Sequence, residues 1–251
     1  MQRHPAGALA LAAAGGLLGG GALLGLAAFL FYGSFEVIDL GLAGVELLVW
    51  DGLLALGFSV QHSGMIRRPV RRLLGGLLPE ETYGAFFALA SGAALMALLL
   101  LWQRSSFELV SAQGPWRWGF RAGYFLAAAG FVWAARALGS FDPLGGRQVL
   151  SRLTGRERRP MPLVVRGPYR WVRHPAYLFT LVLLWSCPDV TADRLLLNVL
   201  WSAWIVAATR LEERDLEAAF GDGYRRYRRE VPRLIPIRAK PVPERVVEKG
   251  A

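Results

Sequence analysis

A run of 21 residues without a charged side chain extends from residue 82 to residue 102 (TYGAFFALASGAALMALLLLW). A helix of this length rises about 30 Å, which matches the thickness of the hydrocarbon core of a bilayer. The composition agrees, since 54% of the residues are hydrophobic and only 19% are charged. These observations predict an integral membrane protein.

Five further apolar runs predict additional membrane-spanning helices. The first is longer than the apolar core of a signal peptide, about 7 to 15 residues, and is therefore expected to be retained as a span. The last two are expected to form a helical hairpin, with its second helix continuing past the membrane as an amphipathic segment. The fold class expected is an all-α integral membrane protein with about six transmembrane helices. The five runs are residues 7–32, 42–61, 118–138, 176–187 and 195–209.

Positive charges concentrate on one side of the predicted spans. The segments 62–81, 139–175 and 210–251 are rich in Arg and Lys, whereas the alternating loops contain few. Cytoplasmic loops carry this excess in membrane proteins. We therefore expect a multi-pass protein of the cell inner membrane with both termini in the cytoplasm.

The net charge of +10 admits several partners. Arginines beside spans set topology and contact anionic lipid, so anionic lipid at the cytoplasmic face is an expected partner. No nucleic-acid-binding module is visible, so nucleic acid is not expected. Cys187 is the single cysteine, and the three histidines lack metal-site spacing, so no metal is predicted.

Residues 166–179 (RGPYRWVRHPAYLF) combine cations, aromatic rings and two prolines just before an apolar run. Pro168 and Pro175 predict a compact turn between them, followed by a helix from Ala176. The N-terminus of that helix suits a carboxylate or phosphate, and aromatic faces suit a ring or a cation. A zwitterionic, adenine-bearing ligand at the membrane edge would fit, although an interfacial belt of Tyr, Trp and Arg has the same composition.

Residues 210–236 (RLEERDLEAAFGDGYRRYRREVPRLIP) form the second unusual segment. Glu212 and Glu213 lie where the last span leaves the membrane, a costly position unless a cation lies beside them. The alternative is a surface helix whose acids pair with neighbouring arginines. The helix is expected to break at two glycines and to resume with two tyrosines on one face: Gly221, Gly223, Tyr224 and Tyr227.

In this order the two segments resemble the C-terminal core of the isoprenylcysteine carboxyl methyltransferase and phospholipid methyltransferase superfamily, over about residues 160 to 237. The motifs that carry the resemblance are GPYRWVRHPAY, the hairpin, EER and FGDGYRRYRREVPRLIP. The upstream segments QHSGMIRRP, PEETY and SFDPLGGRQV resemble the bacterial branch that includes methanethiol S-methyltransferases and relatives named for nitrite and nitric oxide reduction. Phe179, where many members have glycine, and Ser140, where a histidine is expected, depart from the pattern.

The resemblance implies that the cofactor is S-adenosylmethionine, bound in a cytoplasmic pocket built by the hairpin and the tail helix. It also implies ten cofactor-binding residues. These are Leu163, Val164, Gly167, Tyr169, His174, Pro175, Ala176, Tyr177, Glu212 and Glu213.

The expected reaction is methyl transfer to a small thiol, with methanethiol giving dimethyl sulfide. Such a displacement needs a desolvated nucleophile about 3 to 3.5 Å from the methyl group. A thiolate is the reactive form of a thiol, so a base would assist. His62 and Asp142 are the catalytic candidates, although His62 could equally be a polar helix end near Ser63.

Three alternatives remain open from the sequence. The methyl acceptor could be a prenylcysteine, a phospholipid or another lipophilic molecule. The chain could be an NADPH-dependent membrane reductase, since sterol reductases share a similar C-terminal pattern. It could also be a non-catalytic membrane partner of a redox system. In each case we expect one membrane domain over residues 1–237 and a disordered polar tail over residues 238–251.

Overall fold

The computed structural model describes residues 5–75, 79–139, 142, 144–154, 162–238 and 240–247. The described chain is mostly helical, with four strands of three or four residues. The long helices are α1 (Pro5–Tyr32), α2 (Gly44–Ile66), α4 (Glu80–Leu101), α5 (Gly114–Leu138), α7 (Pro175–Trp185) and α8 (Ala192–Glu230). The short elements are α3 (Arg68–Gly75), α6 (Gly146–Leu153), the 3₁₀ helix η1 (Gly167–Arg170), β1 (Glu108–Ser111), β2 (Leu163–Val165), β3 (Asp189–Thr191) and β4 (Arg245–Val247).

Four of the described helices are long and apolar enough to cross a membrane, namely α1, α2, α4 and α8. The predicted all-α membrane fold class is therefore confirmed. Helix α5 has sufficient length, 25 residues, but carries three arginines, and α7 has only 11 residues. The count of six spans and the positions of the termini stay predictions.

The chain divides into two compact units, and the single membrane domain expected over residues 1–237 stays a prediction. Unit 1 comprises residues 1–109, 142–158 and 190–201, and unit 2 comprises residues 110–141, 159–189 and 202–251.

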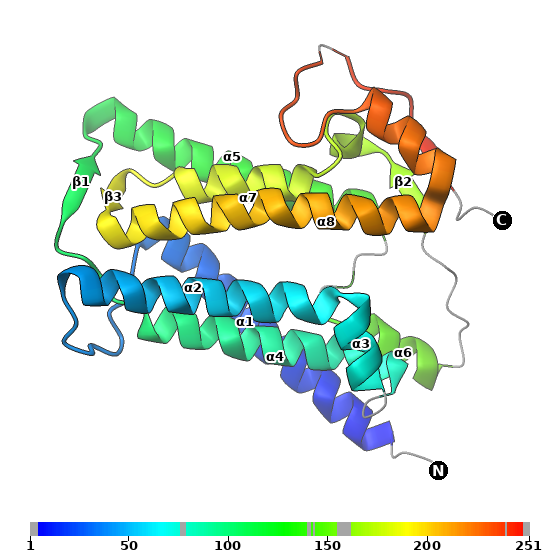
Figure 1. The fold of residues 1–251 in the computed structure, drawn as a ribbon, viewed down its shortest axis with the longest axis horizontal. Helices are drawn as coiled ribbons and strands as arrows, with labels where there is room; N and C mark the ends of the chain where they lie inside the picture. Colours follow the sequence, from blue (N-terminus) through cyan, green and yellow to red (C-terminus); the bar gives the residue numbers. More distant parts are fainter. Residues whose placement is uncertain are drawn as a thin grey trace. The chain divides into compact units, whose positions relative to one another are not determined.

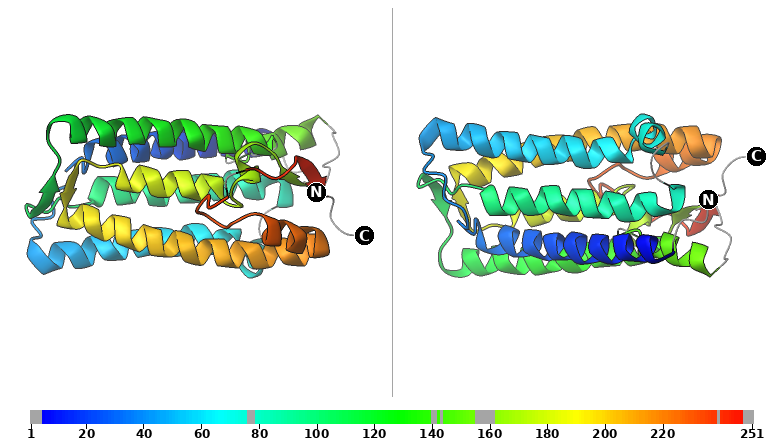
Figure 2. Two further views of the ribbon diagram at one scale, coloured as in Figure 1. Left: turned by 90° about the horizontal axis from the view of Figure 1, so that it is seen from above. Right: turned by 90° about the horizontal axis from the view of Figure 1, so that it is seen from below.

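In unit 1, helices α1 and α4 lie side by side (Figures 1 and 2). Small residues permit this close approach, because a Cβ atom on Gly92 would lie 2.8 Å from the Cα of Gly19. Likewise, a Cβ atom on Gly15 would lie 2.6 Å from the carbonyl oxygen of Ala85. The glycines of the first span therefore serve helix packing.

The start of α8 is anchored within unit 1 by two adjacent buried charges. Asp193 accepts hydrogen bonds from Trp102 Nε1 at 3.0 Å and from the backbone N–H of Ser105 at 2.9 Å. Arg194 donates to the carbonyl oxygens of Phe29 and Leu30, at 3.2 and 2.9 Å. These carbonyls lie in the last turn of α1, and that of Phe29 also accepts the backbone N–H of Gly33 at 2.8 Å. The two charges thus tie α8 to the ends of α1 and α4.

In unit 2, α5 packs along α7. A Cβ atom on Gly130 would overlap the ring of Phe179, so the missing side chain of the glycine makes room for the phenylalanine. Phe179 was noted as a departure from the family pattern, and Gly130 accommodates it.

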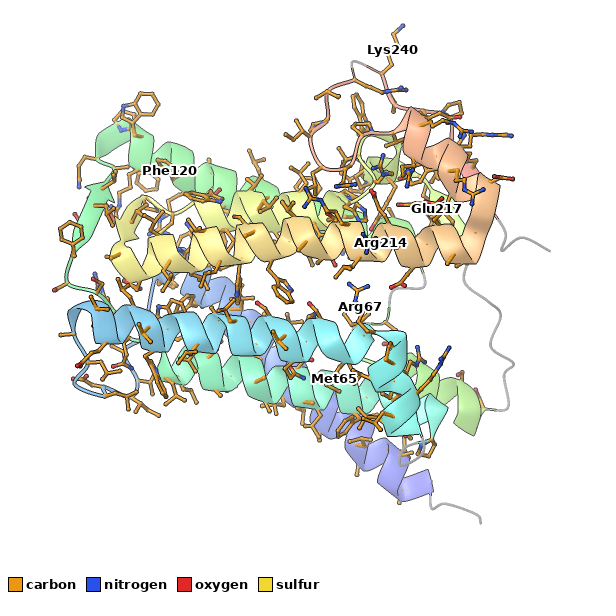
Figure 3. The ribbon with its side chains drawn as sticks, viewed as in Figure 1. Met65, Arg67, Phe120, Arg214, Glu217 and Lys240 are labelled. Atoms are coloured by element: carbon orange, nitrogen blue, oxygen red, sulfur yellow. The ribbon has the colours of Figure 1, made fainter. Side chains whose placement is uncertain are left out.

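Helix α8 spans 39 residues, and its part before Gly221, 29 residues or about 44 Å long, exceeds the thickness of a bilayer core of about 30 Å. Its apolar part ends near Thr209, and its second part, in unit 2, carries charged residues that include Arg214 and Glu217 (Figure 3). Gly221 has φ 51° and ψ −128°, which breaks the helical path. The predicted continuation of the last span and the predicted break at the glycine are both confirmed.

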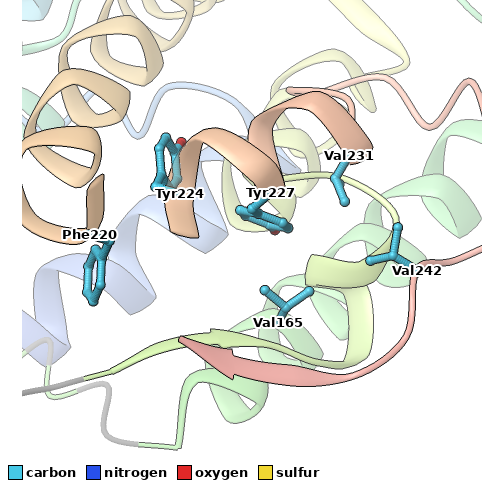
Figure 4. Packing of buried hydrophobic residues seen from close by; sticks show 6 residues of the cluster. All are labelled: Val165, Phe220, Tyr224, Tyr227, Val231 and Val242. Atoms are coloured by element: carbon cyan, nitrogen blue, oxygen red, sulfur yellow. The ribbon is translucent and has the colours of Figure 1, made fainter. Parts of the chain in front are cut away.

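A small hydrophobic core follows this break in unit 2 (Figure 4). Strand β4 pairs antiparallel with β2, with Val165 opposite Arg245 and Leu163 opposite Val247. Residues 245–247 of the tail form β4, and on β2 the side chains of Val165 and Leu163 pack in or against this core, whereas Val246 of β4 is exposed. The disorder expected for the tail stays a prediction. The core consists of Val165, Phe220, Tyr224, Tyr227, Val231 and Val242.

Candidate functional site

The turn that precedes α7 begins at Gly167, whose φ of 56° lies in the region that favours glycine. A Cβ atom there would also lie 3.2 Å from Trp133 Nε1. The chain then forms the single 3₁₀ turn η1, and α7 begins at Pro175 with His174 as its N-cap. The predicted compact turn between the two prolines is confirmed, and the helix begins one residue before the predicted Ala176.

Glu213 lies at the centre of a buried charge network in unit 2. Its exposed fraction is 3%, and three cationic or polar side chains converge on it. Arg173 Nε donates to Oε1 at 2.8 Å, and Arg233 Nη2 donates to Oε2 at 2.9 Å. His174 Nε2 lies 3.3 Å from Oε1. The sequence predicted a cation beside the paired glutamates, and the structure supplies two arginines.

Glu212 lies on the other side of the same imidazole ring. Its Oε2 atom is 3.7 Å from His174 Nδ1, and its side chain is 45% exposed. The His174 ring therefore lies within 4 Å of both carboxylates. Both oxygens of Glu213 already accept hydrogen bonds, whereas the side chain of Glu212 is half exposed. Of the two glutamates, Glu212 therefore offers the carboxylate that a ligand can approach.

The C-terminal segment holds the turn in place through its backbone. The N–H groups of Arg173 and His174 donate to the carbonyl oxygens of Pro232 and Arg233, at 2.9 and 3.1 Å. Val242 N donates to the carbonyl oxygen of Arg170 at 3.2 Å. The segment after α8 thus fixes the main chain of residues 170–174.

Tyr169 lies in η1 and is bound through its backbone carbonyl, which accepts a hydrogen bond of 2.6 Å from the Tyr227 hydroxyl. Burial, and then the negative charge of Glu212, raise the pKa of the Tyr169 phenol well above its ordinary value. The phenol is therefore neutral at physiological pH and presents a flat, uncharged ring.

All ten predicted cofactor-binding residues belong to unit 2. Leu163 and Val164 form β2, Gly167 and Tyr169 lie in η1, and His174 caps α7. The ring of Tyr177 lies 5.8 Å from the ring of His174. The remaining members begin α7 or lie in α8: Pro175, Ala176, Glu212 and Glu213.

Two parts of this site were absent from the sequence prediction. Arg233 was not recognised as a partner of Glu213, and strand β4 was not recognised at all. The valines of PVPERVV are a weak signal for a strand. No local sequence pattern indicates that Arg233 pairs with Glu213, 20 positions earlier.

No protein-family profile matches the chain, and no solved structure matches it. Several bacterial proteins named methanethiol S-methyltransferase are similar to this chain. The protein from a Pseudomonas species is 34% identical over 191 residues, which cover 75% of this chain and 73% of the relative. The protein from Mycobacterium tuberculosis is 34% identical over 205 residues, covering 81% and 79%.

This chain belongs to the methanethiol S-methyltransferase family. The family resemblance read from the motifs is thereby confirmed. A more distant relative is nurim of the rat, which is 28% identical over 190 residues and covers 67% of this chain and 68% of its own length.

The two catalytic candidates of this methyltransferase family member belong to unit 1, whereas the ten cofactor-binding candidates belong to unit 2. His62 lies in α2, where its ring stacks on Phe58 at 5.4 Å and contacts Phe87 at 5.1 Å. Asp142 precedes α6, and its backbone carbonyl accepts the N–H of Gly145 at 3.3 Å. These contacts do not test a catalytic role for His62 or for Asp142, so both roles stay predictions. Ser140, the other departure from the family pattern, lies outside the described residues.

The basic run 225–229 lies in the Arg-rich segment 210–251, for which contact with anionic lipid was predicted. In the structure, Arg225 and Arg228 both bind Glu217, at 2.8 Å each. The alternative interpretation, in which acids of the tail helix pair with nearby arginines, is therefore confirmed for Glu217. A lipid contact of this run stays a prediction.

Proposed function

We propose that this protein transfers a methyl group from S-adenosylmethionine to methanethiol and releases dimethyl sulfide. The observation that carries the proposal is that His174, at the start of α7, lies within 4 Å of the carboxylates of Glu212 and Glu213 in α8. These contacts bring together the HPAY and EER motifs, on which the family resemblance rests. The relatives named methanethiol S-methyltransferase supply the acceptor.

The residues present fit an amino-acid cofactor bearing a sulfonium group. The half-exposed carboxylate of Glu212 suits an ammonium or sulfonium cation. The first turn of α7 has no side-chain cap, so its N–H groups suit a carboxylate. The neutral ring of Tyr169 and the ring of Tyr177 suit an adenine base. When bound, S-adenosylmethionine supplies an electrophilic methyl group.

The protein's own task is then to hold the reactants and to remove a proton. Proximity and orientation contribute a large part of the acceleration in such displacements. The thiol must lose its proton to become a strong nucleophile, and we propose His62 or Asp142 as the group that assists. Glu213, Arg173 and Arg233 keep the turn before α7 in one conformation.

We also propose that the protein lies in the cell inner membrane with both termini in the cytoplasm. The asymmetric distribution of arginine supports this topology. Reporter fusions at residues 75, 110 and 251 test it, and a cytoplasmic signal from the fusion at residue 110 would contradict it.

Headspace gas chromatography on cells that express the chain and receive methanethiol tests the reaction. Dimethyl sulfide above an empty-vector control is the expected result. Calorimetric titration of the detergent-purified protein with S-adenosylmethionine and with NADPH tests the cofactor. Binding of S-adenosylmethionine without formation of dimethyl sulfide would indicate a larger lipophilic acceptor. Binding of NADPH would indicate a reductase, and binding of neither would indicate a non-catalytic protein.

A further inference from the structure

Four aromatic side chains from three helices, one buried and three partly buried, form a continuous row in unit 1. The ring centroids of Trp201 and Phe58 are 5.6 Å apart, and those of Phe58 and His62 are 5.4 Å apart. The ring of Phe87 lies 5.1 Å from His62 on its other side. Helices α8, α2 and α4 therefore meet at this row.

Two members of the row carry buried polar atoms that the described residues leave without a hydrogen-bond partner. These atoms are His62 Nδ1 and Trp201 Nε1. A buried polar atom without a partner costs about 1 to 3 kcal/mol, and in a membrane span no surrounding water can replace the missing partner. The row therefore combines apolar ring surfaces with two nitrogen atoms that lack a hydrogen-bond partner among the described residues.

Asn198 adds to this pattern on the same face of α8, three positions before Trp201. Its exposed fraction is 0%, and neither its Oδ1 nor its Nδ2 has a partner within the described part of the chain. Ser59 Oγ of α2 differs in this respect, because it donates to the carbonyl oxygen of Ala55 at 2.7 Å. An asparagine with both amide atoms unsatisfied inside a membrane span indicates a ligand.

The chemistry of these groups matches a small thiol. A thiol sulfur makes favourable contacts with aromatic rings, and its methyl group gains from apolar walls. The S–H group is a weak donor and the sulfur a weak acceptor. They complement a ring nitrogen such as His62 Nδ1 and an N–H donor such as Trp201 Nε1. Water would satisfy the polar atoms but would gain nothing from the three flanking aromatic side chains.

We propose that Phe58, His62, Phe87, Trp201 and Asn198 form the binding site for the thiol acceptor. This inference rests on the proposed function and deepens it. The aromatic side chains select a small, weakly polar sulfur compound. Asn198 and Trp201 Nε1 bind it through hydrogen bonds.

The test uses the full-length protein in detergent and two variants that remove a polar group and keep a large apolar or aromatic side chain. Trp201→Phe removes the N–H donor and keeps an aromatic ring, and Asn198→Leu removes the amide. The KM for methanethiol should rise about fivefold to tenfold in each, the factor expected for one lost hydrogen bond. The affinity for S-adenosylmethionine, measured by calorimetry, should stay unchanged. Ser59→Ala, whose hydroxyl is satisfied within its own helix, is the matched control and should leave both quantities unchanged.

A second measurement needs no turnover. Methanethiol should raise the thermal unfolding midpoint of the cofactor-free wild type and of Ser59→Ala, and it should not raise that of either variant. A methanethiol KM within twofold of wild type in both variants would overturn the site. An unchanged midpoint in the wild type would also overturn it and would leave water as the partner of these atoms.

The two proposals fail in different ways. If the wild type produces dimethyl sulfide and both variants keep its KM, the site is wrong and the proposed function stands. If the wild type produces none, but methanethiol still stabilises it and not the variants, the thiol site stands and the proposed transfer is wrong.

Discussion

Arg173 and Glu213, 40 residues apart in the chain, are joined at a single carboxylate oxygen. Arg173 Nε donates to Glu213 Oε1 at 2.8 Å, and its Nη2 lies 2.7 Å from the same atom. Both side chains are buried, so the pair is favourable only because other groups satisfy the second oxygen. Arg233 supplies that bond. Since Arg173 directly precedes His174, this ion pair fixes the N-terminal end of α7 against α8 within unit 2.

The two adjacent glutamates should therefore respond differently to the same substitution. Glu213→Gln leaves two arginines without their buried anion, and should lower the free energy of unfolding by about 3 to 5 kcal/mol as well as weaken S-adenosylmethionine binding. Glu212→Gln removes a half-exposed carboxylate, and should weaken binding about tenfold while changing stability by less than about 0.5 kcal/mol. Thermal unfolding and calorimetric titration measure both quantities.

Arg228→Ala is the control for this pair, because its side chain binds the exposed side of Glu217 instead of Glu213. It should leave cofactor affinity unchanged. Equal losses of affinity in all three variants would show general destabilisation and would contradict distinct roles for the two glutamates.

Truncation after Pro243 should weaken cofactor binding even though it removes no predicted cofactor-binding residue. It deletes β4, whose partner strand β2 contains Leu163 and Val164. We expect a several-fold loss of affinity for S-adenosylmethionine and faster amide hydrogen exchange in residues 163–165, with exchange in α4 as the internal control. Unchanged exchange in β2 would mean that the pairing contributes nothing to the site.

Gly130→Ala should destabilise the protein by about 1 to 3 kcal/mol, because a Cβ atom there overlaps the ring of Phe179. Helix propensity alone would favour alanine by about 1 kcal/mol, so a net loss reports the overlap. In a Phe179→Ala background the same substitution should be neutral or stabilising. A double-mutant cycle on thermal unfolding gives the coupling, and purely additive effects would contradict the contact.

The ion pair between Arg117 and Asp189 predicts a pH dependence of stability outside the spans. Burial alone would raise the pKa of Asp189. Hydrogen bonds from Arg117 and Ser111, with the positive charges of Arg117 and Arg121, outweigh burial and lower it. A carboxylate with a lowered pKa stabilises the fold above its unfolded value of about 3.9 and loses this contribution as the pH falls below it.

The unfolding midpoint of the wild type should therefore exceed that of Asp189→Asn by a constant amount between about pH 5 and pH 8. The difference should shrink as the pH approaches 3. A difference that grows on acidification would mean that the carboxyl is stabilised in its protonated form.

Several features of this protein follow from local sequence alone. An uncharged run of 21 residues has one stable arrangement in a bilayer, because a helix satisfies all of its own backbone hydrogen bonds. Prolines and Gly221 act on the backbone dihedral angles at their own positions, so the turn before α7 and the break in α8 were predictable. The motifs around His174 and Glu213 identified the family for the same reason, since they are contiguous in the chain.

Only the tertiary structure decided how these local pieces meet. Glu212 and Glu213 are neighbours of the same type, yet one is buried among arginines and the other is half exposed, because α8 turns them to different sides. Arg233 and β4 join the site through long-range contacts that leave no periodic signal. The unsatisfied atoms of Asn198 and Trp201 are likewise a property of packing between helices. Hydrogen-bond partners distant in sequence depend on the path of the whole chain, and no short pattern of residues encodes them.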